Sequence, residues 1–199
     1  VDTRLRLATE YYAQGQFGGA LRELLSAQEI YDQYAPLHNM FGVVYLDLKQ
    51  YENSEKGFQR AIQLAPNDPE IHNNYGWSLC VRGNYTQGIQ WLARAWDNPL
   101  YSTPEKALYN AGRCAKMQRD LVRAMDYWTK ALVLSPQSTG ILFEIAQLYS
   151  DQGKYKEAFQ LIDRIHQIGG ETPQRLWLAI NMARKTGQNA EMESYGQRL

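Results

Sequence analysis

Small and large apolar residues recur along this chain with a period close to 34 residues. Six small residues that stand among larger neighbours set the period: Ala8, Gly42, Gly76, Gly112, Ala146 and Ala179. Sixteen residues after each small position comes a large one: Leu24, Phe58, Leu92, Trp128, Ile162 and Tyr195. Small residues let two helix backbones approach, while large residues fill the flanking grooves. The pattern therefore predicts six pairs of closely packed helices.

A helix–turn–helix unit of this length is typical of the tetratricopeptide repeat. The first helix of a pair is expected to end near Gly15, Gly83 and Gly153, because glycine accepts a left-handed backbone. The second helix is expected to stop before Pro66 and Pro136, which cannot continue it. We predict an all-α, right-handed superhelical tetratricopeptide solenoid of six helix–turn–helix repeats. Residues 1–199 should form a single domain, with repeats at about 1–34, 35–68, 69–104, 105–138, 139–171 and 172–199.

The composition excludes some classes of partner. Apolar residues make up 44% of the chain, as in ordinary globular proteins. The 21 basic and 21 acidic residues cancel, which argues against a nucleic-acid binder with a strongly basic face. No apolar run is long enough to span a membrane. The start at Val1 instead of Met leads us to expect a processed or trimmed chain whose targeting segment has been removed.

The sequence offers no arrangement of catalytic residues. It has no phosphate-binding glycine loop, no nucleophile elbow and no zinc-protease helix motif, so we expect no enzymatic activity and no cofactor. His38 and His72 lie four residues before consecutive small positions, which suggests a two-histidine metal site. Zinc needs more ligands than that, and repeat equivalence explains the spacing without a metal. We therefore expect a structural role for both histidines and no metal.

Cys80 and Cys114 fall in the first helices of repeats three and four, which should be neighbours in space. Two buried free thiols are one interpretation. In an oxidising compartment their placement would permit a disulfide between the two repeats, provided that the Cα atoms lie within about 7 Å. The sequence leaves both states open.

The concave surface of the solenoid is the expected binding site. It should be lined by side chains at fixed offsets from the small positions of the first four repeats: Leu5, Thr9, Tyr12, Asn39, Val43, Leu46, Asn73, Trp77, Tyr109 and Arg113. A mainly apolar and amide groove with a cationic fourth repeat suits an extended or helical peptide segment. The alternative is that several of these residues only pack between neighbouring helices. The carboxylate clamp of chaperone-binding tetratricopeptide proteins is absent, since the first two repeats place Leu5, Thr9, Asn39 and Val43 where it needs Lys and Asn.

Residues 73–80, Asn-Asn-Tyr-Gly-Trp-Ser-Leu-Cys, resemble the third-repeat signature of the PilF/PilW proteins of type IV pilus biogenesis. The flanks are also similar: Ala-Pro-Asn-Asp-Pro-Glu-Ile-His before the signature and Asn-Pro-Leu-Tyr-Ser-Thr-Pro after it. Tyr-Asn-Ala-Gly-Arg-Cys at 109–114 and the pair Gly169-Gly170 add to the likeness, which covers essentially the whole chain.

The resemblance implies a bacterial outer-membrane lipoprotein that faces the periplasm. Such proteins are pilotins, which bind subunits of the type IV pilus secretin and help them to reach and assemble in the outer membrane. The family's lipid-bearing cysteine belongs at the mature N-terminus, and we expect the anchor to be outside this chain or absent. The periplasmic setting is also what would allow the disulfide between Cys80 and Cys114.

Two other classes of function stay open at this stage. One is a generic cytoplasmic tetratricopeptide scaffold or co-chaperone for a multiprotein complex. The other is a hydrolase or transferase whose catalytic domain lies outside these residues. The precursor sequence separates the lipoprotein hypothesis from the cytoplasmic scaffold, because a lipoprotein carries a signal peptide that ends in a lipid-accepting cysteine.

Overall fold

The computed structural model describes residues 1–169 and 172–199, and every regular element in those residues is an α-helix. The helices follow one another in pairs: α1 (Asp2–Ala13), α2 (Phe17–Ile30), α3 (Ala35–Asp47), α4 (Tyr51–Leu64), α5 (Pro69–Val81), α6 (Tyr85–Trp96), α7 (Pro104–Met117), α8 (Leu121–Leu134), α9 (Thr139–Asp151), α10 (Tyr155–Ile168), α11 (Pro173–Thr186) and α12 (Asn189–Arg198). The predicted tetratricopeptide fold is confirmed. We refer to odd-numbered helices as A helices and to even-numbered ones as B helices. Gly170, part of the glycine pair in the family resemblance, lies outside the described residues.

The chain divides into two compact units, residues 1–124 and 125–199. Helix α8 begins in the first unit and continues in the second. We call them unit 1 and unit 2 and describe each by itself. The expectation of a single domain over residues 1–199 stays a prediction.

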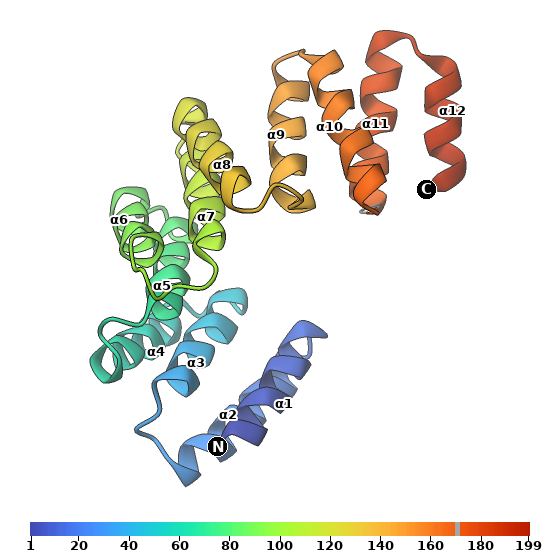
Figure 1. Ribbon diagram of the computed structural model, residues 1–199. Coiled ribbons are helices and arrows are strands. Elements are labelled where there is room, and N and C mark those ends of the chain that lie inside the picture. The colour runs from blue at the N-terminus through green and yellow to red at the C-terminus, as the bar shows by residue number, and fades with distance from the viewer. Residues whose placement is uncertain (170–171) are drawn as a thin grey trace. The chain divides into compact units, whose positions relative to one another are not determined.

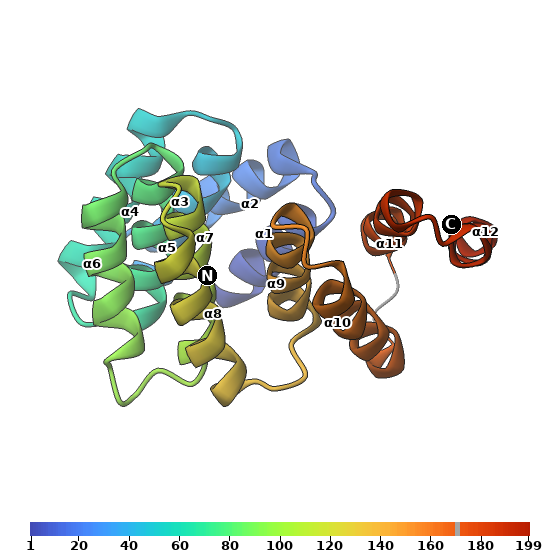
Figure 2. The same ribbon diagram turned by 90° about the horizontal axis from the view of Figure 1, so that it is seen from above.

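In unit 1 the A helices α1, α3, α5 and α7 are successive neighbours, and α2, α4 and α6 each pack against the A helix of their own repeat (Figures 1 and 2). The small positions explain this arrangement. A Cβ atom placed on Gly76 of α5 would lie 2.8 Å from the carbonyl oxygen of Gly88 and 2.9 Å from the amide nitrogen of Leu92, both on α6. The two backbones are therefore too close for any side chain at this point.

Large residues fill the space beside each crossing. Leu24, Phe58 and Leu92, which lie sixteen residues after the small positions of the first three repeats, are fully buried. In unit 2 the equivalent Ile162 is also fully buried, and Tyr195 of the last repeat is nearly so. The sequence pattern thus identified the core residues of both units correctly.

The turn within each of the first five repeats has a left-handed residue seven positions after the small one. Gly15, Gly83 and Gly153 hold this position with φ of 71°, 84° and 74°. In repeats two and four the same position is held by Lys49 and Arg119, with φ of 58° and 65°. The turn geometry is therefore kept where glycine is missing, although non-glycine residues adopt this region at a cost.

Proline marks the start of several helices, and side chains cap the start of α5 and of α8, where Asp120 accepts from the amide of Arg123 at 3.0 Å. Asp68 accepts a hydrogen bond from the amide of Glu70 at 2.8 Å and a longer one from Ile71, just before Pro69 opens α5. The carboxylate satisfies amide groups that have no partner inside the helix. The stretch that carries the family resemblance is thereby fixed at its beginning.

Candidate partner-binding surface

The ten residues expected to line the binding surface all lie on the A helices of unit 1. We call this surface the A-helix face. Thr9 is exposed, and seven others are half-buried: Leu5, Tyr12, Asn39, Val43, Trp77, Tyr109 and Arg113. Leu46 and Asn73 are only 6% and 4% exposed. These two side chains are packed between neighbouring helices in the free protein, as the alternative interpretation from the sequence proposes.

The face begins with a hydrogen bond between the first two A helices. The hydroxyl of Tyr12 on α1 donates to Oδ2 of Asp47 on α3, with the two oxygens 2.6 Å apart. Burial, and then the neighbouring Asp47 carboxylate, raises the pKa of Tyr12 well above its usual value. The phenol therefore stays protonated and acts as the donor, which ties repeat one to repeat two.

A relay of side-chain amides crosses the middle of the face. Nδ2 of Asn110 on α7 donates to Oδ1 of Asn73 on α5 at 3.0 Å, and Nδ2 of Asn73 donates to the adjacent Asn74 at 3.2 Å. Nδ2 of Asn74 then donates to Oδ1 of Asn39 on α3 at 3.3 Å. Three A helices are thus linked through one line of amides. Each amide also keeps donor or acceptor capacity beyond these bonds, because an NH₂ group has two hydrogens and a carbonyl oxygen two lone pairs.

Aromatic rings hold the cation of repeat four. The guanidinium carbon of Arg113 on α7 lies 4.1 Å from the ring centroid of Trp77 on α5 and 5.7 Å from that of Tyr109. A guanidinium over an aromatic face is attracted by the electrons of the ring. The rings therefore orient the Arg113 side chain on the face next to the amide relay.

Asn74 and Asn110 are not among the ten residues that the sequence predicts for the face. Both lie two residues before a small position, whereas Asn39 and Asn73 lie three before one. The structure shows that the two offsets meet: the later helix contributes the residue at minus two and the earlier helix the residue at minus three. This regularity was present in the sequence as two pairs of asparagines at matching positions.

The histidines have the repeated structural role that was expected. Nε2 of His38 lies 2.6 Å from the carbonyl oxygen of Asp32, and Nε2 of His72 lies 2.8 Å from that of Pro66. Each ring thus donates to the connection between its own repeat and the one before. Over the described residues no group of three or more His, Cys, Asp or Glu side chains could hold a metal ion. Nor does any described helix have the length and apolar character needed to cross a membrane.

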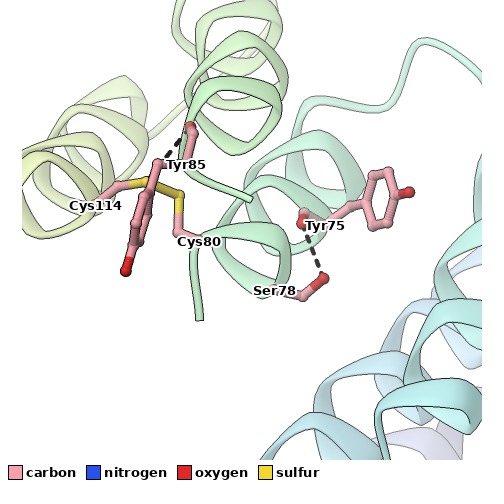
Figure 3. The surroundings of a disulfide bond; sticks show 5 residues. All are labelled: Tyr75, Ser78, Cys80, Tyr85 and Cys114. Atoms are coloured by element: carbon pink, nitrogen blue, oxygen red, sulfur yellow. Dashed lines mark hydrogen bonds between the residues drawn. A yellow bond between two sulfur atoms is a disulfide. The ribbon is translucent and has the colours of Figure 1, made fainter. Parts of the chain in front are cut away.

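Cys80 and Cys114 form a disulfide in the structure, and their Cα atoms are 5.4 Å apart. Figure 3 shows Cys80 and Tyr75 on opposite sides of α5, with the disulfide directed toward α7. The carbonyl oxygen of Tyr85, at the start of α6, lies 3.7 Å from Sγ of Cys114 (Figure 3). Both cysteines are fully buried, so neither is part of the accessible face.

Sequence comparison identifies the repeat independently. Two family profiles described as tetratricopeptide repeat match residues 35–68 and 58–90. The first match has the bounds predicted for repeat two.

Among known proteins, the chain is homologous to the type IV pilus assembly protein PilF of Pseudomonas aeruginosa. The two are 25% identical over 198 residues, which is 100% of this chain and 79% of PilF. A human cell division cycle protein 16 homolog is 25% identical over 124 residues, but these are 59% of this chain and 20% of that protein. Of these two matches, the one to PilF extends over the whole chain.

Solved structures give the same result for the fold. The crystal structure of PilW, described as a widely conserved type IV pilus biogenesis factor, has a TM-score of 0.84 and 24% identity, and the match covers 100% of this chain and 91% of PilW. The structure of Pseudomonas aeruginosa PilF has a TM-score of 0.80 and 25% identity, with 100% and 89% of the two chains covered. MamA is more distant, with a TM-score of 0.61 and 16% identity over 82% of this chain and 94% of its own.

Proposed function

We propose, from the premise that this chain is a tetratricopeptide homologue of PilF, that it is a non-catalytic adaptor of type IV pilus biogenesis. Its partners would be subunits of the pilus secretin, and its role that of a pilotin, which promotes secretin localisation and assembly in the outer membrane. Similarity to PilF over the whole chain is the observation that carries the proposal. The tetratricopeptide fold, a protein-interaction scaffold, supports an adaptor instead of an enzyme.

The A-helix face of unit 1 is the surface that we assign to the secretin. It combines accessible apolar area, at Val43 and Trp77, with the amide relay and an oriented arginine. Apolar and aromatic area supplies affinity in protein interfaces, while amides and arginine satisfy the polar groups of a bound segment. A peptide segment of a secretin subunit fits this chemistry.

The disulfide supports an extracytoplasmic site of action. Disulfides persist in the bacterial periplasm and are rare in the cytosol. The bond between Cys80 and Cys114 therefore favours the periplasmic reading over a cytoplasmic scaffold. Anchoring at the outer membrane would come from a lipid on a different cysteine, because both of these are bonded to each other inside helices. Incorporation of labelled palmitate into the full precursor, and accumulation of a labelled but uncleaved form on globomycin treatment, is the test of that part.

The binding face is tested with purified secretin subunits and variants of its accessible residues. Thr9→Arg and the double variant Val43→Glu with Trp77→Ser should each weaken binding measured by calorimetry, because they place charge on the face or remove its apolar area. Leu100→Ser is the matched control, since Leu100 is apolar and exposed but lies in the α6–α7 connection. Unchanged affinity in both test variants, with native circular dichroism, would exclude this face.

A further inference from the structure

A groove lies between the B helices α2 and α4 in unit 1, and α3 forms its floor. Its volume is about 360 Å³, in the range of small-molecule and side-chain pockets. The lining residues come from α2 and the connection after it, from α3 and from α4: Leu25, Gln28, Asp32, His38, Phe41, Tyr45, Asn53, Lys56, Gly57 and Arg60. None of the ten residues predicted from the sequence to bind a partner lines it.

The floor of the groove is aromatic. The rings of Phe41 and Tyr45 stack with centroids 6.0 Å apart and an angle of 12° between their planes. The His38 ring lies 6.3 Å from that of Phe41. On the wall that α2 forms, Leu25 is 50% exposed. Phe41 and His38 are each only 6% exposed, so the accessible apolar area of the groove lies mainly at Leu25 and at the half-buried Tyr45.

The opposite wall carries cations. Arg60 lies 3.7 Å from the carboxylate of Asp32, and that carboxylate also accepts a hydrogen bond from Gln28 at 2.8 Å. These contacts engage the acidic group that lines the groove. Lys56 is exposed, and no carboxylate of the described residues lies within 4.0 Å of its Nζ. The rim beside the aromatic floor therefore has excess positive charge.

The equivalent surface of the next repeat shows what covers such a floor. Residue 57 lies fifteen positions after Gly42, and the residue fifteen positions after Gly76 is Trp91. The indole of Trp91 packs on His72 and on Tyr75, with centroid distances of 5.1 Å in both cases. Arg94 covers the outer face of the indole at 4.3 Å. Repeat three thus fills its own floor with an aromatic ring beneath a cation.

Every partner of that indole has an equivalent in repeat two. His38 corresponds to His72, Phe41 to Tyr75, and Arg60 to Arg94, each one repeat of 34 residues earlier. Only the indole itself has no counterpart, because its position is Gly57.

Repeat two cannot supply that ring itself. A Cβ atom on Gly57 would lie 2.7 Å from the backbone nitrogen of Gly42 and 3.0 Å from the carbonyl oxygen of His38. Helices α3 and α4 therefore approach too closely at this point for a side chain. Position 57 therefore cannot supply the ring that Trp91 supplies in repeat three.

We infer that the groove between α2 and α4 is a docking site for an aromatic side chain of a partner protein, flanked in the partner by a carboxylate. The ring contacts Leu25 and Tyr45 above the buried Phe41 and His38, and the carboxylate meets Lys56. This site opens between two B helices, with the A helix α3 as its floor, and does not depend on the role of the A-helix face. The kind of segment that fits is an acidic one with a central Trp, Phe or Tyr.

The test uses peptide probes and the whole chain. The acetylated and amidated peptide Ala-Glu-Trp-Glu-Ala is compared with Ala-Lys-Trp-Lys-Ala and Ala-Glu-Ser-Glu-Ala, and binding is followed by backbone amide NMR. We expect the acidic tryptophan peptide to shift the signals of Phe41, Lys56 and Gly57 in a saturable way. The serine peptide should leave them unchanged, and the lysine peptide should bind several-fold more weakly.

A charge reversal separates this site from general attraction to basic residues. Lys56→Glu should weaken the acidic peptide several-fold and strengthen the lysine peptide, because it reverses the charge on the rim. Lys106→Glu, at an exposed lysine of α7 outside the groove, is the matched control and should change neither affinity. The inference is overturned if the acidic tryptophan peptide shifts no groove signals, or if the two lysine variants behave alike. Neither result bears on secretin binding, which is measured separately.

Discussion

Cys80 of α5 and Cys114 of α7 bond the A helices of repeats three and four to each other across 34 residues of sequence. The bond is buried beneath the A-helix face. It joins the same two helices that carry Trp77 and Arg113. It therefore holds in register the two repeats whose side chains form the aromatic and cationic part of the face.

Loss of this bond should destabilise the protein. Closing a loop of this length in the unfolded chain is expected to contribute about 2–4 kcal/mol to the free energy of unfolding. The double variant Cys80→Ala with Cys114→Ala, compared with the oxidised protein by urea denaturation, should show that loss. Thiol titration of the denatured, unreduced protein is the direct check on the bond. Two free thiols per chain would contradict it.

Gly76→Ala should destabilise the protein although alanine favours helix formation. The added Cβ would meet backbone atoms of α6 at 2.8 and 2.9 Å, so the two helices must separate, at a cost of about 1–3 kcal/mol. Gly196→Ala is the matched control, because that glycine also lies in a helix but has no atom within 4 Å of an added Cβ. This control should stabilise by up to about 1 kcal/mol. Thermal denaturation is the measurement: the melting temperature should fall in Gly76→Ala and rise in Gly196→Ala.

Asn73→Leu should destabilise the protein, although it replaces a buried polar side chain with an apolar one. The substitution removes the acceptor of Asn110 and the donor to Asn74 in a buried place, and an unsatisfied amide there costs about 1–3 kcal/mol. Asn39→Ala, at the half-buried end of the relay, should cost clearly less because water can replace the lost partner. A free energy of unfolding equal to that of the unchanged protein in both variants would show that the relay does not stabilise the A helices.

Acidification should destabilise unit 2 through His166. Burial, and then the charge of Arg198, lowers the pKa of His166 below its usual value of 6.5, and its Nε2 has no hydrogen-bond partner in the described residues. Asp163 opposes the shift and Arg175 adds to it. Because the folded pKa is the lower one, the unfolded chain binds more protons, so stability is full above pH 6.5 and falls as the pH drops through the folded value.

The measurement for His166 is urea denaturation at about pH 7.5 and pH 5.5, on either side of the usual histidine range. His166→Phe keeps a ring beside Tyr195, which lies 5.8 Å away, but cannot take up a proton. The variant should lose less stability than the wild-type chain between the two pH values. Equal losses would assign the pH dependence to other groups.

The amino-acid sequence determined the architecture of this protein, because each repeat is specified locally. Ala8, Gly42 and Gly76 mark helix crossings within single repeats, and a fixed offset from them gives the buried Leu24, Phe58 and Leu92. Both helices of a crossing lie within a few tens of residues, so their pattern can be read directly. The ten predicted partner-binding residues all lie on the helices α1, α3, α5 and α7.

Some turns departed from the sequence signal. Lys49 and Arg119 adopt the left-handed backbone that glycine provides in the other repeats. Local propensity does not predict this conformation for lysine or arginine, and the packing of the two helices on either side imposes it.

Only the tertiary structure decided how consecutive repeats meet. It buried Asn73 and Leu46, joined Asn74 to Asn39, and placed Arg113 on Trp77. These contacts join residues about one repeat apart, and they depend on the offset and tilt between neighbouring helix pairs, which side-chain packing sets and no local pattern encodes. The same is true of the groove over Phe41, since the sequence shows the glycine at position 57, but only the packed helices show the groove with its stacked rings beside it.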